Sequence, residues 1–190
     1  LYEQYGNDFV SRLDGFFAFA LYDSKRGKMI LARDRLGIKP LVWFRTKDAF
    51  VFASTIPALR AHPGFPHELS AQAVWDFLSL QYVPRGTVYP GVEKLPPGFM
   101  AELSEGKLTL SRYWKADYSK TLDISYPDAC AELRHLVRNA VADRLISDVP
   151  LGVFLSGGMD STIIAGLAAE AVDGPLKCYS IGFNEKDYDE

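Results

Sequence analysis

A short run of small and hydroxylated residues near the end of the chain, Ser156-Gly157-Gly158-Met159-Asp160-Ser161, has the composition of an anion-binding loop. Two adjacent glycines lack the Cβ atoms that would hold a phosphate away from the backbone amide groups. The serine hydroxyls can donate further hydrogen bonds to phosphate oxygens. A carboxylate in such a loop repels a bare anion, so Asp160 predicts a bridging cation, and Mg²⁺ is the cation that carboxylate and phosphate oxygens bind together.

The residues on either side of this run predict the elements that would position it. Leu151–Leu155 is a short apolar run that fits a strand buried on both faces, and Thr162–Glu170 has alanine and leucine at helical spacing. In a strand, glycine turn and helix start, the free N–H groups and the positive dipole end of the helix point into the turn. The same residues also allow a purely structural turn, with Ser156 as N-cap and Asp160 set against the helix dipole.

The order Ser-Gly-Gly-x-Asp-Ser excludes two common nucleotide motifs and resembles a third. No Gly-Lys-Ser/Thr follows the glycines, so the run is not a Walker A loop, and it does not match G-x-G-x-x-G. It resembles the pyrophosphate loop of the ATP-pyrophosphatases, which split ATP into AMP and pyrophosphate. The resemblance implies ATP and Mg²⁺ as ligands.

Size and charge exclude several classes of protein. The chain has 190 residues, a net charge of −3 and a sequence pI near 5.7, so it has no electrostatic footprint for nucleic acid or an anionic membrane. Cys130 and Cys178 are isolated, and the three histidines are scattered, so neither a disulfide framework nor a metal knuckle is expected. No spanning run or signal peptide is visible. The sequence predicts a soluble, cytoplasmic protein, and its start at Leu1 and stop after a strand predict a fragment.

Alternating apolar residues and turn residues in the first half predict a strand-rich unit. Asp23–Gly27 and Glu105-Gly106 should each close a hairpin. The first four strands should form one antiparallel meander, with both faces covered. The expected strands are Phe16–Tyr22, Lys28–Arg33, Leu41–Phe44, Ala49–Ala53, Phe99–Leu103 and Lys107–Arg112.

Helices are expected at three places in this half. Leu1–Leu13 has the spacing of the end of a helix, with Gly6 as a weak point, and Ser54–Ala61 predicts a short helix. Ser70 should cap a helix over Ala71–Leu80. The buried face of that helix should carry Val74, Phe77 and Leu78. Residues 83–98, dense in Pro and Gly, should wrap the unit as an extended segment.

The last third predicts a second unit. Ser125 and Asp128 with Pro127 between them predict the start of a helix that runs to about Ile146. Its arginines, Arg134, Arg138 and Arg144, fit a solvated flank better than a phosphate clamp. Lys177–Phe183 should form the next strand, and strand, helix, strand implies a parallel, doubly wound sheet with ligand at the carboxyl ends of the strands.

Three blocks together resemble glutamine-hydrolysing asparagine synthetase. They are Leu13–Asp23, Ala32–Leu41, and Ser147–Gly152 running into the glycine loop. Leu95-Pro96-Pro97-Gly98 and Tyr113-Trp114 stand where that family also has them. The resemblance covers essentially the whole chain.

This resemblance implies a mixed α/β and α+β fold. Residues 1–116 correspond to the C-terminal half of a glutaminase domain, an αββα sandwich of the N-terminal-nucleophile hydrolase type. Residues 117–125 correspond to a linker. Residues 126–190 correspond to the start of the doubly wound ATP-binding domain.

The implied reaction is the amidation of aspartate, with glutamine as the nitrogen donor and ATP as the activator, through β-aspartyl-AMP. By position, Ser156, Gly157, Gly158, Asp160 and Ser161 should hold the pyrophosphate end of ATP, with Asp160 on Mg²⁺. Phe154, Leu155 and Ile181 fall where the family lines the adenosine pocket, although buried strand positions are apolar in any case. The expected partners are ATP, aspartate and glutamine, and the family is compatible with a homodimer.

Departures from the family pattern limit what is carried over. The nucleophilic cysteine of the glutaminase would precede Leu1, so no catalytic residue is assignable, and the 190 residues alone should be inactive. Thr55 stands where the family commonly has an acid, and Met159 replaces a common Leu. The run Arg33-Asp34-Arg35 fits a buried, salt-bridged turn that supports the glutaminase site and the domain contact better than it fits a direct role in the mechanism, which stays open as the alternative.

Two other functions stay open on the sequence. A relative could adenylate another carboxylate, as a β-lactam-forming synthetase or a peptide amidotransferase does. A catalytically silent scaffold could keep the fold, although the intact Ser156, Asp160 and Ser161 argue against decay at the nucleotide end.

Overall fold

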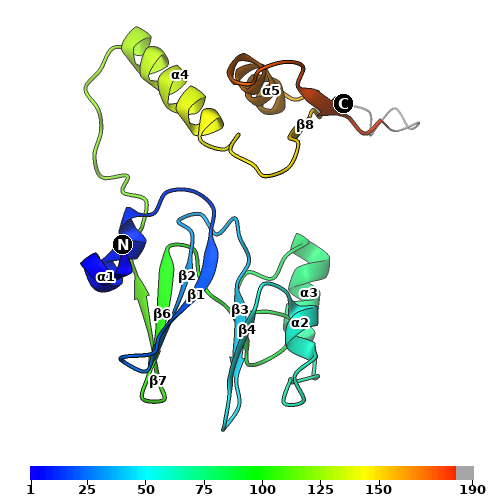
Figure 1. Cartoon of the computed structure of the whole chain (residues 1–190). Coiled ribbons are helices and arrows are strands. Elements are labelled where there is room, and N and C mark those ends of the chain that lie inside the picture. The colour runs from blue at the N-terminus through cyan, green and yellow to red at the C-terminus, as the bar shows by residue number, and fades with distance from the viewer. Residues whose placement is uncertain (183–190) are drawn as a thin grey trace. The chain divides into compact units, whose positions relative to one another are not determined.

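The computed structural model describes residues 1–182, and the chain divides into two compact units, Leu1–Tyr118 and Ser119–Glu190 (Figure 1). None of the helices in the described part is long and apolar enough to cross a membrane. The expected linker at 117–125, and the domain limits on either side of it, remain predictions.

The first unit is built on two antiparallel sheets. The larger sheet has the order β1-β2-β6-β7, and the smaller has the order β4-β3-β5. The strands are β1 (Ala18–Asp23), β2 (Lys28–Arg33), β3 (Val42–Arg45), β4 (Phe50–Ala53), β5 (Val92–Lys94), β6 (Phe99–Ser104) and β7 (Lys107–Arg112). The helices are α1 (Tyr2–Tyr5), the 3-10 helix η1 (Gly6–Arg12), α2 (Ile56–Arg60) and α3 (Ala71–Leu80).

The two sheets pack face to face between helical layers, as Figure 1 shows. The core between the sheets joins Leu31 of β2 and Ala101 of β6 to Phe50 and Phe52 of β4. The outer face of the larger sheet is covered by η1, and the outer face of the smaller sheet by Leu59 of α2. This layering confirms the expected αββα arrangement. Successive side chains of each strand point to opposite faces of its sheet, one toward the other sheet and one toward the covering helix.

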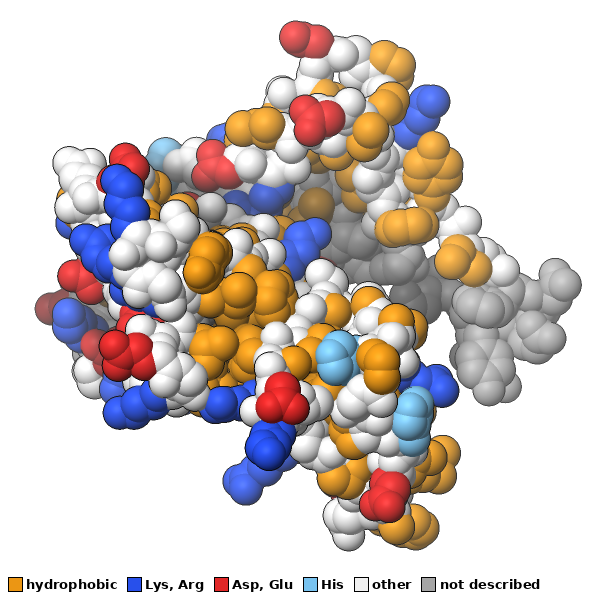
Figure 2. Space-filling model, turned by 60° about the horizontal axis from the view of Figure 1, so that its bottom comes forward, with side chains coloured by type: hydrophobic (Ala, Val, Ile, Leu, Met, Phe, Trp, Pro, Cys, Tyr) orange, Lys and Arg blue, Asp and Glu red, His pale blue; other side chains and the backbone are white. Residues whose placement is uncertain are grey.

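The hairpin-turn end of this unit leaves part of that inter-sheet core open. Figure 2 shows hydrophobic side chains gathered there, bordered by charged side chains of both signs. Met29, Phe50 and Leu108, which pack against the inter-sheet core, are only partly buried. The hairpins themselves are as expected, since Asp23 pairs with Lys28, and Ser104 with Lys107.

The expected four-stranded meander is wrong. β1 and β2 belong to one sheet and β3 and β4 to the other, because β2 pairs with β6 on its free edge and the chain after β2 crosses to the second sheet. The sequence also missed β5, which pairs with β3 inside the segment expected to be merely extended. Pairing between segments about 50 (β3 and β5) and about 70 (β2 and β6) residues apart leaves no local signal in the sequence.

Two helix predictions need correction. The N-terminal segment is a single α-turn followed by a 3-10 helix rather than one helix, and the break falls at Gly6, whose φ is +55°. The helix α3 is capped by Ser70 as expected, with the Ala73 amide donating to its hydroxyl over 3.2 Å. Its predicted buried face is wrong, however. Phe77 and Leu78 are exposed, because α3 meets the rest of the unit through Ala73.

The second unit contains α4 (Tyr126–Ala142), β8 (Gly152–Phe154), α5 (Met159–Ala171) and β9 (Lys177–Tyr179). Ser125 caps α4, and the Asp128 amide donates to its hydroxyl, as predicted. The helix ends before Ile146, because Arg144 and Leu145 donate to carbonyls only three residues back and so tighten the last turn. β8 and β9 are parallel, which confirms the predicted strand, helix, strand order; Phe183, at the end of the predicted strand, lies outside the described residues.

A buried carboxylate fixes the crossing between the two sheets. Asp34, directly after β2, is 1% exposed. Its two oxygens accept hydrogen bonds from the amide groups of Leu36 (3.2 Å), Ile38 (3.0 Å) and Lys39 (2.9 Å). Burial acts to raise the pKa of Asp34, but these amide groups outweigh burial and hold the pKa below its usual value.

Arg33 braces the same crossing from the other side. Its guanidinium donates to the carbonyls of Lys39 (2.8 Å), Leu95 (2.7 Å) and Gly37 (2.7 Å). Within residues 1–182 Asp34 forms no ion pair, so the predicted salt-bridged turn is wrong: backbone groups neutralise both charges. Gly37 is required here, because its φ is +70° and a Cβ would lie 2.8 Å from Cγ of Pro97.

Two further segments close on this crossing. The Gly98 amide donates to the Asp34 carbonyl (3.0 Å), and the amides of Tyr113 and Trp114 donate to the Gly98 carbonyl. The Tyr113 hydroxyl donates to the Arg33 carbonyl over 2.6 Å, and burial together with the Asp34 charge raises the pKa of Tyr113 to about 12. Arg33 and Asp34, Gly98, and Tyr113, which lie far apart in the sequence, therefore meet at the crossing between the two sheets.

Replacing Asp34 tests how much stability this carboxylate contributes. Asp34→Asn keeps the shape but removes the charge and presents a donor to amide donors, so the free energy of unfolding should fall by at least about 2 kcal/mol. Urea unfolding of the 190-residue chain measures it. Asp48→Asn is the matched control on an exposed turn and should change stability by less than about 0.5 kcal/mol. Equal effects of the two substitutions would contradict the role given to Asp34.

Acid should destabilise the first unit in a defined window. The Arg26 and Tyr2 hydrogen bonds lower the pKa of Asp23 from 3.8 to about 2, and a hydrogen bond from Asn7 lowers the pKa of Glu102. A carboxyl group whose pKa is lower in the folded chain stabilises it above the unfolded pKa, and this stability is lost as the pH falls through the folded pKa. The urea midpoint should therefore be level down to about pH 5 and fall between about pH 4 and pH 2.

Asp23→Asn should make that fall shallower, because one of the shifted carboxyl groups is gone, whereas Asp48→Asn should leave its slope unchanged. A urea midpoint that stays constant down to pH 2 in the unsubstituted chain would show that these contacts do not persist in solution.

Candidate functional site

The candidate loop follows a strand and opens a helix, as the sequence predicts. β8 pairs with β9 in parallel, and the Leu155 amide extends the pairing by donating to the Tyr179 carbonyl over 2.8 Å. α5 begins at Met159, three residues earlier than the predicted helix. The loop therefore stands at the carboxyl end of the strand, where ligands bind in parallel sheets.

Hydroxyl groups hold the loop against the first turn of α5. The Ser156 hydroxyl lies 3.2 Å from the Ser161 hydroxyl and accepts a long hydrogen bond from the Gly158 amide, 3.4 Å. The hydroxyls of Ser161 and Thr162 both donate to the Gly158 carbonyl over 2.9 Å. Thr162 was not among the residues that the sequence singled out, and only its hydroxyl beside a Ser-Gly-Gly loop could have pointed to it.

The N-cap of α5 is Gly158, not Ser156, so the structural alternative for this loop is wrong in that detail. Gly158 has the extended backbone of an N-cap, and within residues 1–182 no side chain caps the helix. The first amide groups of α5 thus keep their donors, with the positive end of the helix dipole behind them. Gly157 has a φ of +89°, a conformation that few residues with a side chain adopt.

Asp160 lies in the first turn of α5 and is exposed. No group of three or more His, Cys, Asp or Glu side chains gathers to hold a metal ion anywhere in residues 1–182. A single carboxylate beside hydroxyl groups and free amide groups fits a Mg²⁺ ion that takes its remaining ligands from phosphate oxygens and water. It does not fit a metal held by the protein alone.

The three residues expected in the adenosine pocket lie near the loop but are not packed as predicted. Phe154 is 78% exposed and Ile181 is 75% exposed, while Leu155 is partly buried. The prediction that Leu151–Leu155 is buried on both faces is therefore wrong, because the two-stranded sheet lacks covering layers within the described residues. The ring of Tyr179, a residue that no sequence pattern marked as part of the site, lies 6.4 Å from that of Phe154.

Ser180 ties the two strand ends together, since its hydroxyl donates to the Leu155 carbonyl over 2.7 Å. Leu155, Ser180 and Ile181 thus share the edge of the sheet that carries the loop. No catalytic residue is assigned in the first unit. Both described cysteines, Cys130 and Cys178, belong to the second unit.

Comparison with known proteins places both units in families. A family model described as "Glutamine amidotransferase domain" matches residues 1–114, and one described as "Asparagine synthase" matches residues 132–190. The glutamine-hydrolysing asparagine synthetase 3 of Bacillus subtilis is 35% identical over 98% of this chain and 31% of its own length. A protein named amidase chry2, from Gibberella zeae, is 32% identical over 97% of this chain and 30% of its own length.

A solved glutamine phosphoribosylpyrophosphate amidotransferase from Bacillus subtilis aligns with 90% of this chain and 33% of that chain, at 17% identity and a TM-score of 0.35. A similarity of that size carries no conclusion. The chain spans about a third of the length of the two curated relatives. By the family models, the chain belongs to the glutamine amidotransferase domain family over residues 1–114 and continues into an asparagine synthase domain over residues 132–190.

Proposed function

We propose that this chain is part of an enzyme that converts aspartate to asparagine, with glutamine as the nitrogen donor and ATP as the activator. Glutamine and water give glutamate and ammonia in the amidotransferase domain. Aspartate attacks the α-phosphorus of ATP through its side-chain carboxylate and expels pyrophosphate. Ammonia then attacks the activated carbonyl and expels AMP, so that atoms and charges balance over the three steps.

The observation that carries the proposal is the loop at the start of α5 within a chain of this double family. Free amide groups of α5, the two serine hydroxyls and the glycines at 157 and 158 form a cradle for the departing pyrophosphate. Mg²⁺ held by Asp160 would neutralise charge on the phosphate oxygens. Ser156 and Ser161 would orient those oxygens, and Leu155 and Ile181, at the same sheet edge, would contact the adenosine.

A second candidate acts on another carboxylate. The asparagine synthetase is 35% identical to this chain and the relative named as an amidase is 32% identical, so identity over these residues does not by itself select the acceptor. The loop would perform the same step for any carboxylate. Mg²⁺, the homodimer and the cytoplasmic location likewise remain predictions.

Product analysis of the full-length parent protein tests the reaction. With ATP, aspartate, glutamine and Mg²⁺, asparagine and pyrophosphate should form in equal amounts. Asp160→Ala should lower that rate at least about 100-fold, because the metal loses its protein ligand. Asp173→Ala, which removes an exposed carboxylate just after the same helix, should leave the rate unchanged. Pyrophosphate release only with a different carboxylate would favour the second candidate, and no ATP turnover with any acceptor would favour the silent scaffold.

The structural contribution of Asp160 should be small, and this makes the activity result interpretable. A carboxylate in the first turn of a helix gains roughly 0.3–1 kcal/mol from the dipole. Asp160→Asn should therefore lower the free energy of unfolding by no more than about 1 kcal/mol, and the difference should shrink in 1 M salt. A loss above about 2 kcal/mol would mean that Asp160 supports the fold, and the loss of activity would then say little about metal binding.

A further inference from the structure

The second unit leaves most of its apolar surface uncovered within residues 119–182. Ala168 is the only hydrophobic side chain there that is fully buried. Parallel sheets are normally covered on both faces, yet Phe154 and Tyr179 on the β8–β9 sheet are more than half exposed. The exposed surface of this unit therefore has the character of an interior.

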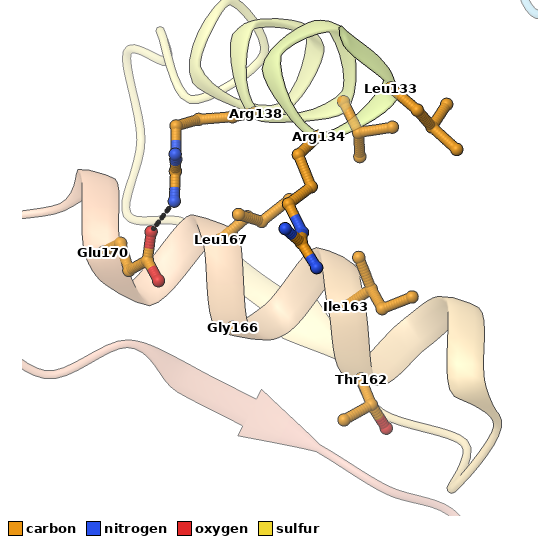
Figure 3. A pocket seen from close by; sticks show the side chains of 9 residues that line it. Leu133, Arg134, Arg138, Thr162, Ile163, Gly166, Leu167 and Glu170 are labelled. Atoms are coloured by element: carbon orange, nitrogen blue, oxygen red, sulfur yellow. Dashed lines mark hydrogen bonds and ion pairs between the residues drawn. The ribbon is translucent and has the colours of Figure 1, made fainter. Parts of the chain in front are cut away.

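A groove of about 460 Å³ runs between α4 and α5 (Figure 3). Its walls are Leu133 and Val137 from α4 and Ile163 and Leu167 from α5. Gly166 leaves it open on the α5 side, because a Cβ placed there would meet nothing within 4 Å. Leu133 and Ile163 are 61% and 47% exposed, so the groove offers apolar area that no described residue covers.

The two arginines along the groove differ in whether they have a partner. Arg138 of α4 pairs with Glu170 of α5 over 2.8 Å and closes one end. Arg134 reaches toward α5 near Ile163, as Figure 3 shows. No described residue gives Arg134 a hydrogen bond or ion pair, in contrast to Arg138. An occupant that fits this groove is apolar along its length and carries a carboxylate at the Arg134 position.

We propose that this groove seats an amphipathic α-helix from a later part of the same polypeptide, with an Asp or Glu of that helix paired with Arg134. A helix fits because a groove between two helices accepts the apolar stripe of a third. The same polypeptide fits because the asparagine synthase family model matches from residue 132, within α4, through α5, and the relative of the whole chain from Bacillus subtilis is about three times as long as this chain. The uncovered sheet indicates that further polypeptide completes this core. The proposal does not depend on the reaction.

Photo-crosslinking in the full-length parent tests the occupant. Leu133→p-benzoylphenylalanine places a reactive ketone in the groove, and irradiation followed by mass spectrometry identifies what it touches. The expected product joins position 133 to a peptide that lies after residue 190. The same replacement of Glu132, the neighbouring residue that does not line the groove, should not label that peptide.

Irradiating a mixture of ¹⁵N-labelled and unlabelled protein separates contacts within one chain from contacts between copies. A crosslink between copies, a crosslink to another protein, or no protein crosslink at all would each overturn the proposal. Because the readout is a covalent product, it holds whether or not the parent makes asparagine.

Filling the groove with a larger side chain tests independently whether a later helix docks there. Gly166→Leu should lower the melting temperature of the parent by at least about 3 °C, because its side chain takes the space of the docked helix. Gly166→Ala, which adds one methyl group to a helix interior, should not lower it. In the 190-residue chain, where the later helix is missing, Gly166→Leu should cause no such loss. An equal loss of melting temperature in the parent and in the 190-residue chain would refute the proposed docking of a later helix in this groove.

Discussion

The hydrogen bonds from backbone amide groups to the buried Asp34 carboxylate are the constraint on which the first unit depends. They turn the chain from the larger sheet to the smaller one within eight residues, 34–41, and β3 can then pair with β4 and β5. A buried charge without partners would be prohibitively costly, so the loop that supplies the amide groups can adopt only this path. The Arg33 guanidinium favours the same path, because its donors are satisfied by carbonyl groups of this loop and of Leu95. Backbone groups that satisfy these two charges thus fix the crossing between the two sheets.

The second unit, in contrast, holds its loop almost without a buried core. Its loop is held by hydroxyl contacts at the surface and by one carbonyl shared between Ser161 and Thr162, with almost nothing buried beneath. Such a loop needs little core to keep its shape, since the strand before it and the helix after it fix both ends. Its amide groups stay available because Gly158, and no polar side chain, occupies the N-cap. A cap that satisfied those donors would compete with an anion.

Local chemistry made part of this structure predictable. The hairpins at Asp23–Gly27 and Glu105-Gly106, the caps at Ser70 and Ser125, and the strand, loop, helix around Ser156 each depend on residues close together in sequence. Features that depend on distant partners were missed or misassigned: the split of the first four strands between two sheets, the strand β5, and the partners of Asp34. Backbone groups carry no residue signature, so a carboxylate bound by amides cannot be told from one bound by arginine.

The sequence also failed to predict which apolar side chains are exposed, and the reason for this concerns the candidate site. An apolar stripe predicts which face of α3 or β8 would be buried, but not whether anything covers it. Phe154 and Ile181 flank the candidate loop and are exposed, although ordinary strand packing would have buried them. The loop residues bind the part of the nucleotide that is the same for every acceptor, under the proposed function. The choice of carboxylate must then come from residues that do not touch pyrophosphate, so the loop residues alone do not select the acceptor.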